Sequence, residues 1–464
     1  MKKAPLFILS VTIILMTSCI GKKSESQATF TGKDGEVKLV VLNPGHFHAS
    51  LLQKNKLPQV NDSMYIYAPQ GVELEQYLST IKSFNSREDQ PTSWQEQVYS
   101  EPDFLDKMLA EKKGNVVVLA GNNREKTNYI SQAVNAGYNV LSDKPMAINK
   151  ADFDLLVQAY QDAEKNNVLL YDMMTERFDE LNIVEKKLIN NKGLFGELIN
   201  GTEEEPAIFM ESVHHFYKEV AGKTLVRPAW YYDVEQQGEG IADVTTHLID
   251  LVNWKCFPEQ EIDYQKDVKV TDATNWATEL SLTDFSNSTG LDSFPSYLGK
   301  YIDDSKLKVN ANGTVNYQLM GKNIALKVMW NYVAPAGGGD TFTSIVKGSK
   351  ATLTTVQDKE HNFVKQLYIE KAEGVSGEDF KSNLDKAIAK IQESYPFVSI
   401  KKSNGKFQII IPIENRSNHE AHFSLVAQNY FGFLINRNMP KWEISNTLTK
   451  YYITTTAVGM ANSK

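Results

Sequence analysis

The sequence of 464 residues predicts an α/β protein in two parts, a doubly wound parallel sheet followed by an α+β domain with a largely antiparallel sheet. From residue 37 to about residue 165, short apolar runs without alternation are separated by helical patterns, as in parallel strands that helices cover on both faces. Beyond about residue 180 the apolar runs alternate with polar residues and are joined by hairpin turns, as in antiparallel sheets.

The first domain, expected over residues 37–170, has the strand and helix order of a Rossmann-like fold. Ligands of such a sheet bind beyond the carboxyl ends of the strands, so the loops that follow the strands form the candidate site. The expected strands are 37–42, 64–68, 115–121, 138–143 and 167–172, and the helices between them are 71–83, 102–112, 124–136 and 150–165.

The second domain, expected over residues 171–464, combines the antiparallel sheet with helices and is the candidate substrate and oligomerisation domain. Its runs include "AIFMESVHHF", "VNYQLMG", "IALKVMWNYV", "SIVKG" and "FQIIIPI". The glycine-rich stretch "PAGGGD" opens no helix and therefore favours a hairpin or loop over a phosphate site. Two helices close the chain, the second over 444–459 and the first with an apolar face made of Phe423, Val426, Ala427, Tyr430, Phe431 and Leu434.

The N-terminus predicts export. Two lysines precede an apolar run that is too short to span a bilayer of ~30 Å, and "TSC" follows this run. The pattern resembles a bacterial lipoprotein signal, with residues 1–18 as the signal peptide, Cys19 as the lipidated residue and residues 19–36 as a polar linker. An ordinary cleaved signal peptide is the alternative. We expect an exported, membrane-anchored lipoprotein on the periplasmic or outer-membrane side, whose only membrane contact is the N-terminal lipid.

The composition narrows the class of ligand. A formal net charge of −8 argues against a nucleic-acid partner, since such binding relies on clustered Lys and Arg. A mildly acidic chain rich in aromatic residues suits a neutral or sugar-like small molecule. Cys256 is the only cysteine besides Cys19, so no internal disulfide is expected in the lipidated chain.

The stretch "VVLNPGHFHASLL", residues 40–52, allows two interpretations. In the first it replaces the G-x-G-x-x-G loop that brings backbone amides to a dinucleotide pyrophosphate, with Asn43, Gly45 and His48 at the three glycine positions. Asn tolerates the left-handed backbone of the first position, but a histidine is bulky at the third. No acid ends the second strand, at "YAPQ", where the ribose of NAD is normally held.

In the second interpretation His46 and His48 are the metal ligands of a hydrolase. A catalytic zinc site needs about three protein ligands, and the sequence offers only separate histidines elsewhere, such as His247 and the "HEAH" motif at 419–422. That motif lacks the i, i+4 spacing of a helical zinc pair. The loop residues alone do not decide between the two interpretations.

Two later blocks resemble the Gfo/Idh/MocA family of nicotinamide-dependent sugar oxidoreductases. In "NVVVLAGNNREKTNYISQAVNAGYNVLSDKPMAI" (115–148), Asp143-Lys144-Pro145 stands for the Glu-Lys-Pro of the family, and Asn123 for the Asn of its Thr-Pro-Asn turn. The block "GEGIADVTTHLIDLVNW" (238–254) is similar to the helix Gly-Gly-x-x-x-Asp-x-x-x-His-x-x-Asp. Lipid-anchored members from Bacteroidetes, which carry a distinctive C-terminal domain, have "NPGHFHA" in place of the glycine loop. The resemblance therefore favours the nucleotide interpretation.

The resemblance also implies a cofactor and roles for individual residues. The cofactor would be NAD or NADP, and Lys144, Asp243 and His247 would be catalytic. No metal ion is part of this assignment. The implied cofactor-binding residues are Asn43, Gly45, His46, His48, Asn123, Asp143 and Pro145.

The residue types suit the oxidation of a secondary alcohol, which needs a positive charge near the oxygen and a base for its proton. Lys144 can supply the charge, and we expect partial burial to lower its pKa. His247, with an ordinary pKa of ~6.5, is the natural base. On one helix, Asp243 and Asp250 would share the face of His247 and orient it or bind sugar hydroxyls. Alternatively, Asp243 is a helix N-cap and Asp250 a surface acid.

Other polar side chains are candidate substrate ligands. Two histidines of "ESVHHF" are neighbours on a strand, so one should face the cleft and the other can be buried structure. Residues of "RPAWYYD" either hold a pyranose ring or pack in the core. His422 either caps a helix or reaches the substrate. The candidate substrate-binding residues are Asp250, His214, His215, Arg177, Arg227, Trp230 and Tyr231.

The leading hypothesis is an NAD(P)-dependent oxidoreductase that oxidises or reduces a hydroxyl group of a carbohydrate substrate, a sugar or glycoside, for instance to form a 3-keto sugar. Because free cofactor is scarce outside the cytoplasm, we expect the nucleotide to stay tightly bound. Three alternatives stay open: a redox-assisted NAD-dependent glycosidase, a metal-dependent hydrolase that uses His46 and His48, and a sugar-binding lipoprotein without catalysis. Open sheets like the second often pair between subunits, so we expect a homo-oligomer.

Overall fold

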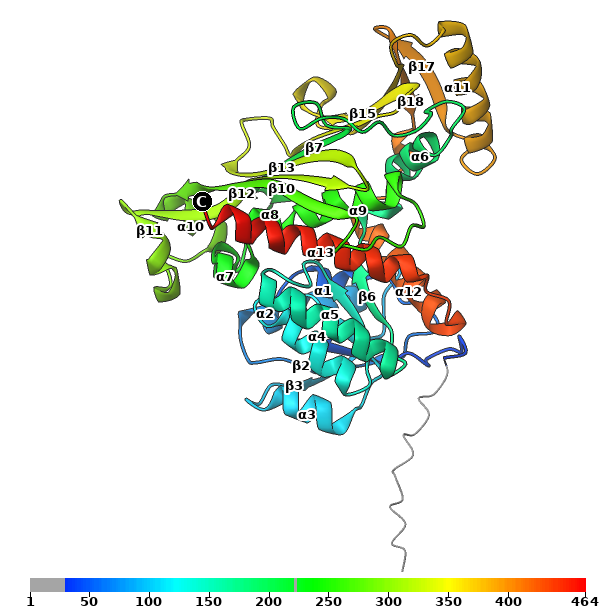
Figure 1. The fold of residues 1–464 in the computed structure, drawn as a ribbon. Coiled ribbons are helices and arrows are strands. Elements are labelled where there is room, and N and C mark those ends of the chain that lie inside the picture. Colours follow the sequence, from blue (N-terminus) through cyan, green and yellow to red (C-terminus); the bar gives the residue numbers. More distant parts are fainter. Residues whose placement is uncertain (1–29, 221–222) are drawn as a thin grey trace, which may run out of the picture.

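The computed structural model describes residues 30–220 and 223–464 of the chain. The predicted signal peptide, the predicted lipid anchor at Cys19 and most of the predicted linker lie outside these residues. Among the described residues, no helix is both long enough and apolar enough to cross a membrane. These residues form a six-stranded sheet, a ten-stranded sheet and a two-stranded ribbon (Figure 1).

The N-terminal sheet has the predicted parallel, doubly wound form. Its strands lie in the order β3-β2-β1-β4-β5-β6, and all neighbours are parallel. This order places the switch point, where ligands of such sheets bind, between β1 and β4. The strands are β1 (Leu39–Leu42), β2 (Ser63–Tyr67), β3 (Gln95–Tyr99), β4 (Val116–Leu119), β5 (Asn139–Asp143) and β6 (Leu170–Met173).

Five of these strands were predicted, and β3 was not. β1, β4 and β6 are buried along their whole length, which explains their unbroken apolar runs. β3 is the edge strand, and none of the residues in its sequence "QEQVY" is buried. A strand outside the core needs no apolar run, so the pattern gave no signal for it.

Helices from both ends of the chain cover this sheet. α3 (Phe104–Glu111), α4 (Lys126–Asn135) and α5 (Lys150–Lys165) share one apolar core with one face. α2 (Val72–Ser86) shares the core of the other face with α12 (His419–Asn436), whose predicted apolar side chains are buried there. The chain therefore returns to the N-terminal sheet after completing the second one (Figure 1).

The C-terminal sheet is mixed and mostly antiparallel. Its strands follow the order β10-β12-β13-β7-β14-β15-β16-β18-β17, with β11 paired to β12, and only the pair β13 and β7 is parallel among the described strands of this sheet. The strands are β7 (Ile208–Tyr217), β10 (Val268–Leu280), β11 (Ile302–Asp303), β12 (Lys306–Leu319), β13 (Lys322–Val333), β14 (Thr341–Lys347), β15 (Ala351–Gln357), β16 (Gln366–Lys371), β17 (Ser399–Ser403) and β18 (Lys406–Ile410). The separate ribbon is β8 (Glu219–Val220) with β9 (Lys223–Thr224).

Helices join the two sheets. α6 (Glu180–Ile189), α9 (Thr245–Cys256) and α11 (Gly377–Gln392) contribute to the core of the second sheet. α13 (Lys441–Ala461) runs between the domains: its Tyr451 is buried in the core of the first, and its Ile453 in the core of the second. The remaining helices of the second domain are α7 (Val234–Gln237), α8 (Gly240–Asp243) and α10 (Leu282–Thr289).

Candidate active site

The loop after β1 packs directly on the loop after β4. Asn43 has the left-handed backbone expected of it, with φ 46°. The amides of Gly45 and His46 both donate to the carbonyl of Ala120, at 3.1 and 3.2 Å. A Cβ atom on Gly121 would lie 2.3 Å from the carbonyl oxygen of Asn43, which explains the glycine at a position where the family has Thr. The two amides are occupied within the protein, so this loop does not present the bare amides of a G-x-G-x-x-G cradle.

The turn after β4 is held by the second domain. Asn123 is buried, and its side-chain amide donates to the carbonyl of Gln237 at 2.7 Å. Its backbone amide donates to the carbonyl of Gln236, at 2.9 Å. Asn123, predicted to contact the cofactor, therefore joins the edge of the first sheet to α7.

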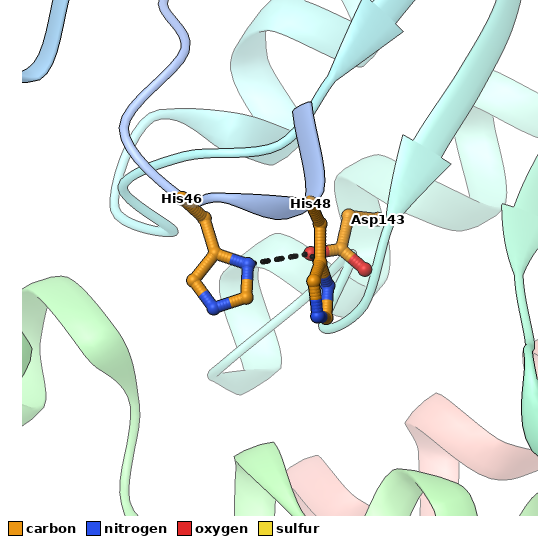
Figure 2. A group of neighbouring side chains, drawn as sticks. All are labelled: His46, His48 and Asp143. Atoms are coloured by element: carbon orange, nitrogen blue, oxygen red, sulfur yellow. Dashed lines mark hydrogen bonds and ion pairs between the residues drawn. The ribbon is translucent and has the colours of Figure 1, made fainter. Parts of the chain in front are cut away.

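His46, His48 and Asp143 meet where β1 and β5 end (Figure 2). Nδ1 of His48 lies 3.0 Å from Oδ2 of Asp143, and Nδ1 of His46 lies 3.4 Å from the same oxygen. Burial lowers the pKa of both histidines. Burial would raise the pKa of Asp143, but the two histidines and Lys126 outweigh it and hold this pKa well below its usual range. Asp143 is thus the third polar group beside the histidine pair, which the sequence pattern did not reveal.

Lys144 follows directly and points to the second domain, where its Nζ lies 2.5 Å from Oδ1 of Asp243. The peptide between Lys144 and Pro145 is cis, and Pro145 is buried. The prediction of a lowered lysine pKa is wrong. Burial acts in that direction, but the carboxylates of Asp243 and Asp143 outweigh it and raise the pKa of Lys144.

Asp243 is the last residue of α8, and α9 begins after Val244, so the predicted single helix over 238–254 is interrupted. Its side chain accepts from Lys144 and does not cap α9. Val244 between the two helices keeps a right-handed helical backbone, with φ −75° and ψ −35°, so α8 and α9 follow each other without a sharp turn. Lys144 outweighs burial and lowers the pKa of the Asp243 carboxyl group.

His247 lies one turn further, in α9. Burial, followed by the charge of Lys144, lowers its pKa to about 4. Glu176, Asp243 and His419 also act on this pKa, so all of these groups lie around the imidazole. Nδ1 of His247 is buried and has no hydrogen-bond partner among the described residues. The ring is therefore neutral at ordinary pH and free to accept a proton.

Glu176 was not among the predicted site residues, although it stands next to Arg177 in "TERF". Its carboxylate lies 3.2 Å from Nζ of Lys365, and this lysine holds the pKa of Glu176 below its usual range. The other neighbour, His419, begins α12, and its ring centroid is 5.5 Å from that of His48. A lone acid in a short loop carries no sequence signal, which explains why Glu176 was missed.

Arg177 and Asp250, both predicted to bind substrate, bind each other instead. Nε and Nη2 of Arg177 each lie 2.7 Å from one oxygen of Asp250, and Nη1 lies 2.8 Å from Oε2 of Glu443. Lys450 reaches the same carboxylate of Asp250 at 3.3 Å. All of these side chains are buried, so Asp250 is not a surface acid, and both residues are occupied in an ion-pair network between the domains.

A cavity of about 390 Å³ opens beside His46. Arg227 and Tyr231 line it on the side of the second domain. The guanidinium of Arg227 donates to the carbonyl of Phe216 at 2.6 Å and lies 4.6 Å from the ring centroid of Tyr231. Trp230 is buried and packs close to Gly45. The loop after β1 and the first two turns of α2 complete the wall, through Pro44, Gly45, Phe47, Ser50, Glu73, Gln76, Tyr77, Ser79 and Thr80.

Glu73 is a second residue that the sequence prediction missed. No acid ends β2. Glu73 lies in the first turn of α2, the helix that follows this strand, and it lines the cavity. The signal was present in the sequence three residues beyond "YAPQ". It was not recognised because the acid was sought at the end of the strand itself and not in the helix that follows it.

The two strand histidines share one partner. His215 is buried, while the side chain of His214 is 26% exposed and stacks on Trp330. Nδ1 of His214 and Nδ1 of His215 lie 3.2 and 3.0 Å from different oxygens of Asp340. Asp340 also pairs with Lys218. Asp340, the last residue of "PAGGGD", thus contacts both imidazoles.

His422 is buried in the first turn of α12. Its Nε2 lies 2.8 Å from the hydroxyl of Ser417, and Asn418 is the residue that caps the helix. The histidine therefore supports the start of α12 without capping it.

Comparison with known proteins adds two matching families and several similar structures. Residues 65–171 match "Oxidoreductase family, NAD-binding Rossmann fold", and residues 184–462 match "Putative oxidoreductase C terminal domain". The crystal structure of "a putative oxidoreductase" from Parabacteroides merdae is 47% identical, with a TM-score of 0.92 over 94% of this chain and 100% of that chain. No curated protein matches the chain.

Two distant structures share the fold at 12% identity. Levoglucosan dehydrogenase has a TM-score of 0.59 over 92% of this chain and 97% of its own. KijD10, a 3-ketoreductase from Actinomadura kijaniata in complex with TDP-benzene and NADP, has a TM-score of 0.52 over 90% of this chain and 95% of its own. At this identity the likeness concerns the fold alone.

Proposed function

The chain belongs to the Gfo/Idh/MocA family of NAD(P)-binding oxidoreductases, and from this membership we propose that it oxidises or reduces a hydroxyl group of a sugar or glycoside. The observation that carries the proposal is the ion pair of Lys144 and Asp243 at 2.5 Å, formed across the domain boundary beside the neutral His247. Lys144 follows β5 of the first domain, whereas Asp243 and His247 lie on α8 and α9 of the second, so these groups meet only in the folded protein. They supply the positive charge and the base that the oxidation of an alcohol needs.

The cavity beside His46 suits a nicotinamide dinucleotide in position and chemistry. It adjoins the carboxyl end of β1, and its volume of about 390 Å³ lies in the range of small-molecule sites. Glu73 offers a carboxylate for ribose hydroxyls, the role that an acid after the second strand has in this fold. Because the amides of Gly45 and His46 are occupied, we assign the cofactor contacts to side chains of the cavity wall. A free carboxylate there favours NAD, since it would repel the phosphate of NADP.

When bound, the cofactor accepts or returns the hydride. Lys144 donates a hydrogen bond to the substrate oxygen and stabilises its negative charge as the proton leaves. Asp243 fixes the position of the ammonium group and keeps it charged. His247 takes the proton, since burial keeps its imidazole unprotonated. The two domains bury most of these groups and leave the side chain of Lys144 13% exposed.

The choice of a sugar rests on the second domain and on the distant relatives. Trp330 and Tyr231 are buried in the core of the second domain, but Tyr231 also lines the cavity, and His214 is partly exposed beside Trp330. An aromatic ring and an imidazole at a cavity wall suit a sugar ring, which has apolar faces and hydroxyl groups. Of the proteins with a similar fold, one is named levoglucosan dehydrogenase and another is named a 3-ketoreductase. We therefore propose a ring hydroxyl as the reacting group, with a 3-keto sugar as the product of oxidation.

The N-terminal pattern adds a proposal about location and cofactor exchange. A lipoprotein anchored by Cys19 outside the cytoplasm meets little free nucleotide, so the cofactor stays bound between turnovers. Mass spectrometry of the small molecules released on denaturation tests this directly. A protein that releases no nicotinamide dinucleotide and binds none at micromolar concentration would refute the proposed function.

Turnover is tested with simple glycosides. The purified protein is mixed with methyl glycosides and free hexoses, and reduction of the bound or added NAD is followed by its absorbance. We expect a 3-keto product from at least one of these sugars. Release of the aglycone together with unchanged NAD would identify a redox-assisted glycosidase that uses the same Lys144 and His247.

A further inference from the structure

The side chains of His46, His48 and Asp143 form a compact set of metal-binding atoms beside the cavity (Figure 2). One ligand atom from each residue lies within 4.8 Å of the others. The histidines come from the loop after β1 and the aspartate from the end of β5, so only the folded sheet brings the three together. The sequence pattern offered two ligands here and lacked a third.

The distances from the two histidines to Asp143 match those between ligands of a tetrahedral metal site, and all three ligand atoms lie within 4.8 Å of one another. Ligands bound about 2.0–2.1 Å from a zinc ion lie about 3.3 Å from one another. Nδ1 of His48 and Nδ1 of His46 lie 3.0 and 3.4 Å from Oδ2 of Asp143. Two histidines and one carboxylate are also the ligands of catalytic zinc sites and of mononuclear iron sites.

The ligand atoms are not committed to other partners. Nδ1 of His46 is buried and has no hydrogen bond within the described part of the chain. The two nearby lysines bind elsewhere: Lys126 donates to the backbone carbonyl of Asp143, and Lys144 to Asp243. The carboxylate of Asp143 therefore faces the two imidazoles without a lysine between them.

A second cluster contains the same residue types as the set at His46 but arranges their ligand atoms differently. His214, His215 and Asp340 also combine two histidines and an aspartate. Their imidazoles contact different oxygens of the carboxylate, and Lys218 already pairs with it. Among residues 30–220 and 223–464, only the set at His46 brings three such ligand atoms together.

We propose that His46, His48 and Asp143 bind one divalent transition-metal ion, with zinc as the expected ion. Three protein ligands leave at least one coordination position for water or for an oxygen of a ligand. His46 is part of the wall of the cavity of about 390 Å³, so this position adjoins the place proposed for the cofactor and substrate. The site goes beyond the proposed function, because hydride transfer by Lys144 and His247 does not require it.

Elemental analysis of the full chain without a histidine tag tests the proposal. We expect about one zinc per chain in the wild-type protein and less than a tenth of that in His46→Ala and His48→Ala. His361→Ala is the matched control, because its ring pairs with Asp358 at 2.6 Å outside this set, and we expect it to keep the metal. Circular dichroism shows whether each variant is folded.

Cobalt binding gives a readout that does not depend on any variant. After treatment with a chelator, the wild-type protein is titrated with Co²⁺, and the visible absorption of a tetrahedral site should saturate at about one ion per chain. No zinc in the purified protein together with no cobalt absorption would overturn the proposal. So would metal that both histidine variants retain.

The nucleotide released on denaturation is measured in the same samples. Nucleotide in a protein that contains no zinc and binds no cobalt would refute the metal site and leave the proposed function standing. Metal in a protein that neither releases nor binds a nicotinamide dinucleotide would support the site and refute the proposed function.

Discussion

Two of the buried charge clusters in the described part of the chain differ in whether their charged groups are fully paired within the protein. The interdomain cluster consists of Arg177, Asp250, Glu443, Lys450 and Asp172, and the crevice cluster of His46, His48, Asp143, Lys144 and Asp243. In the interdomain cluster the guanidinium is held by two carboxylates at 2.7–2.8 Å, and Lys450 contacts both of its aspartates. In the crevice cluster one imidazole nitrogen has no hydrogen bond, and the side chains of His46 and Lys144 are still 24% and 13% exposed.

The difference separates structural from functional charge. Buried charge that the protein pairs within itself holds elements in place, although one oxygen of Asp172 stays without a hydrogen bond. Charge and polar atoms that stay without partners beside a cavity are available to a ligand. Sequence position does not make this distinction, since Asp243 and Asp250 belong to the same motif and fall into different clusters.

The largest effect should come from breaking the interdomain cluster. Arg177→Met leaves the carboxylates of Asp250 and Glu443 buried with fewer counter-charges. We expect a loss of about 3–5 kcal/mol in the free energy of unfolding, measured by urea denaturation. Lys381→Met, which removes an exposed pair with Asp385 in α11, is the control and should change little. A loss below about 1 kcal/mol for Arg177→Met would mean that this cluster is not structural.

In the crevice cluster the effect should appear in activity instead. Lys144→Arg keeps a positive charge beside Asp243 but replaces the compact ammonium with a larger planar group, which cannot place its donor at the same point beside the substrate oxygen. We expect kcat to fall on the order of 100-fold, with the midpoint of urea denaturation close to wild type. An equal loss of stability and activity would contradict the division between the clusters.

Acid should act on the two clusters at different pH values. Burial lowers the pKa of His247 to about 4, below its value of ~6.5 in an unfolded chain. As the pH falls, protons therefore bind the unfolded state first, and the stability due to this group is lost between pH 6.5 and 4. The pKa of Asp250 is lowered to about 2 by Arg177 and Lys450 despite burial, so its contribution persists above about pH 4 and is lost as the pH falls to 2.

The measurement is the free energy of unfolding against pH for the wild type and His247→Gln. The charged and titratable groups that face this ring are Lys144, Glu176, Asp243 and His419. We expect the variant to lose less stability than the wild type between pH 6.5 and 4. The kcat/KM of the wild type should stay constant down to about pH 5. A decline that begins near pH 6.5 would show that the catalytic base has an ordinary histidine pKa and is not the buried His247.

The sequence predicted the fold class and five strands of the first sheet because these depend on local patterns of burial. It also singled out Lys144, Asp243 and His247, which the structure brings together, from motifs that resemble the family. It placed Arg177 and Asp250 among the substrate ligands, whereas the structure pairs them with each other and with Glu443 and Lys450 from α13. Which carboxylate meets which cation depends on how distant elements pack, and local periodicity does not contain that information.

Glu73 and Glu176 were missed for a related reason. Each is a single acid in the first turn of a helix, Glu73 in α2 and Glu176 in a short 3₁₀ helix, and its role depends on which loops the sheet order brings together. The order β1-β4-β5 also places Asp143 beside two histidines that precede it by almost 100 positions. Pairings over such distances follow from topology, which a single sequence specifies only indirectly.

The smallest effect should come from the wall of the cavity, at a residue that is proposed to contact the cofactor and does not belong to the crevice cluster. Glu73→Gln removes the negative charge proposed to accept ribose hydroxyls, and we expect NAD to bind about tenfold more weakly. Glu75→Gln, in the same turn of α2 but outside the cavity wall, should bind NAD like the wild type. Titration calorimetry with NAD and NADP on nucleotide-free protein measures both. Weaker binding in both variants would reflect the general charge of α2, and only a loss confined to Glu73→Gln would show that its carboxylate belongs to the nucleotide site.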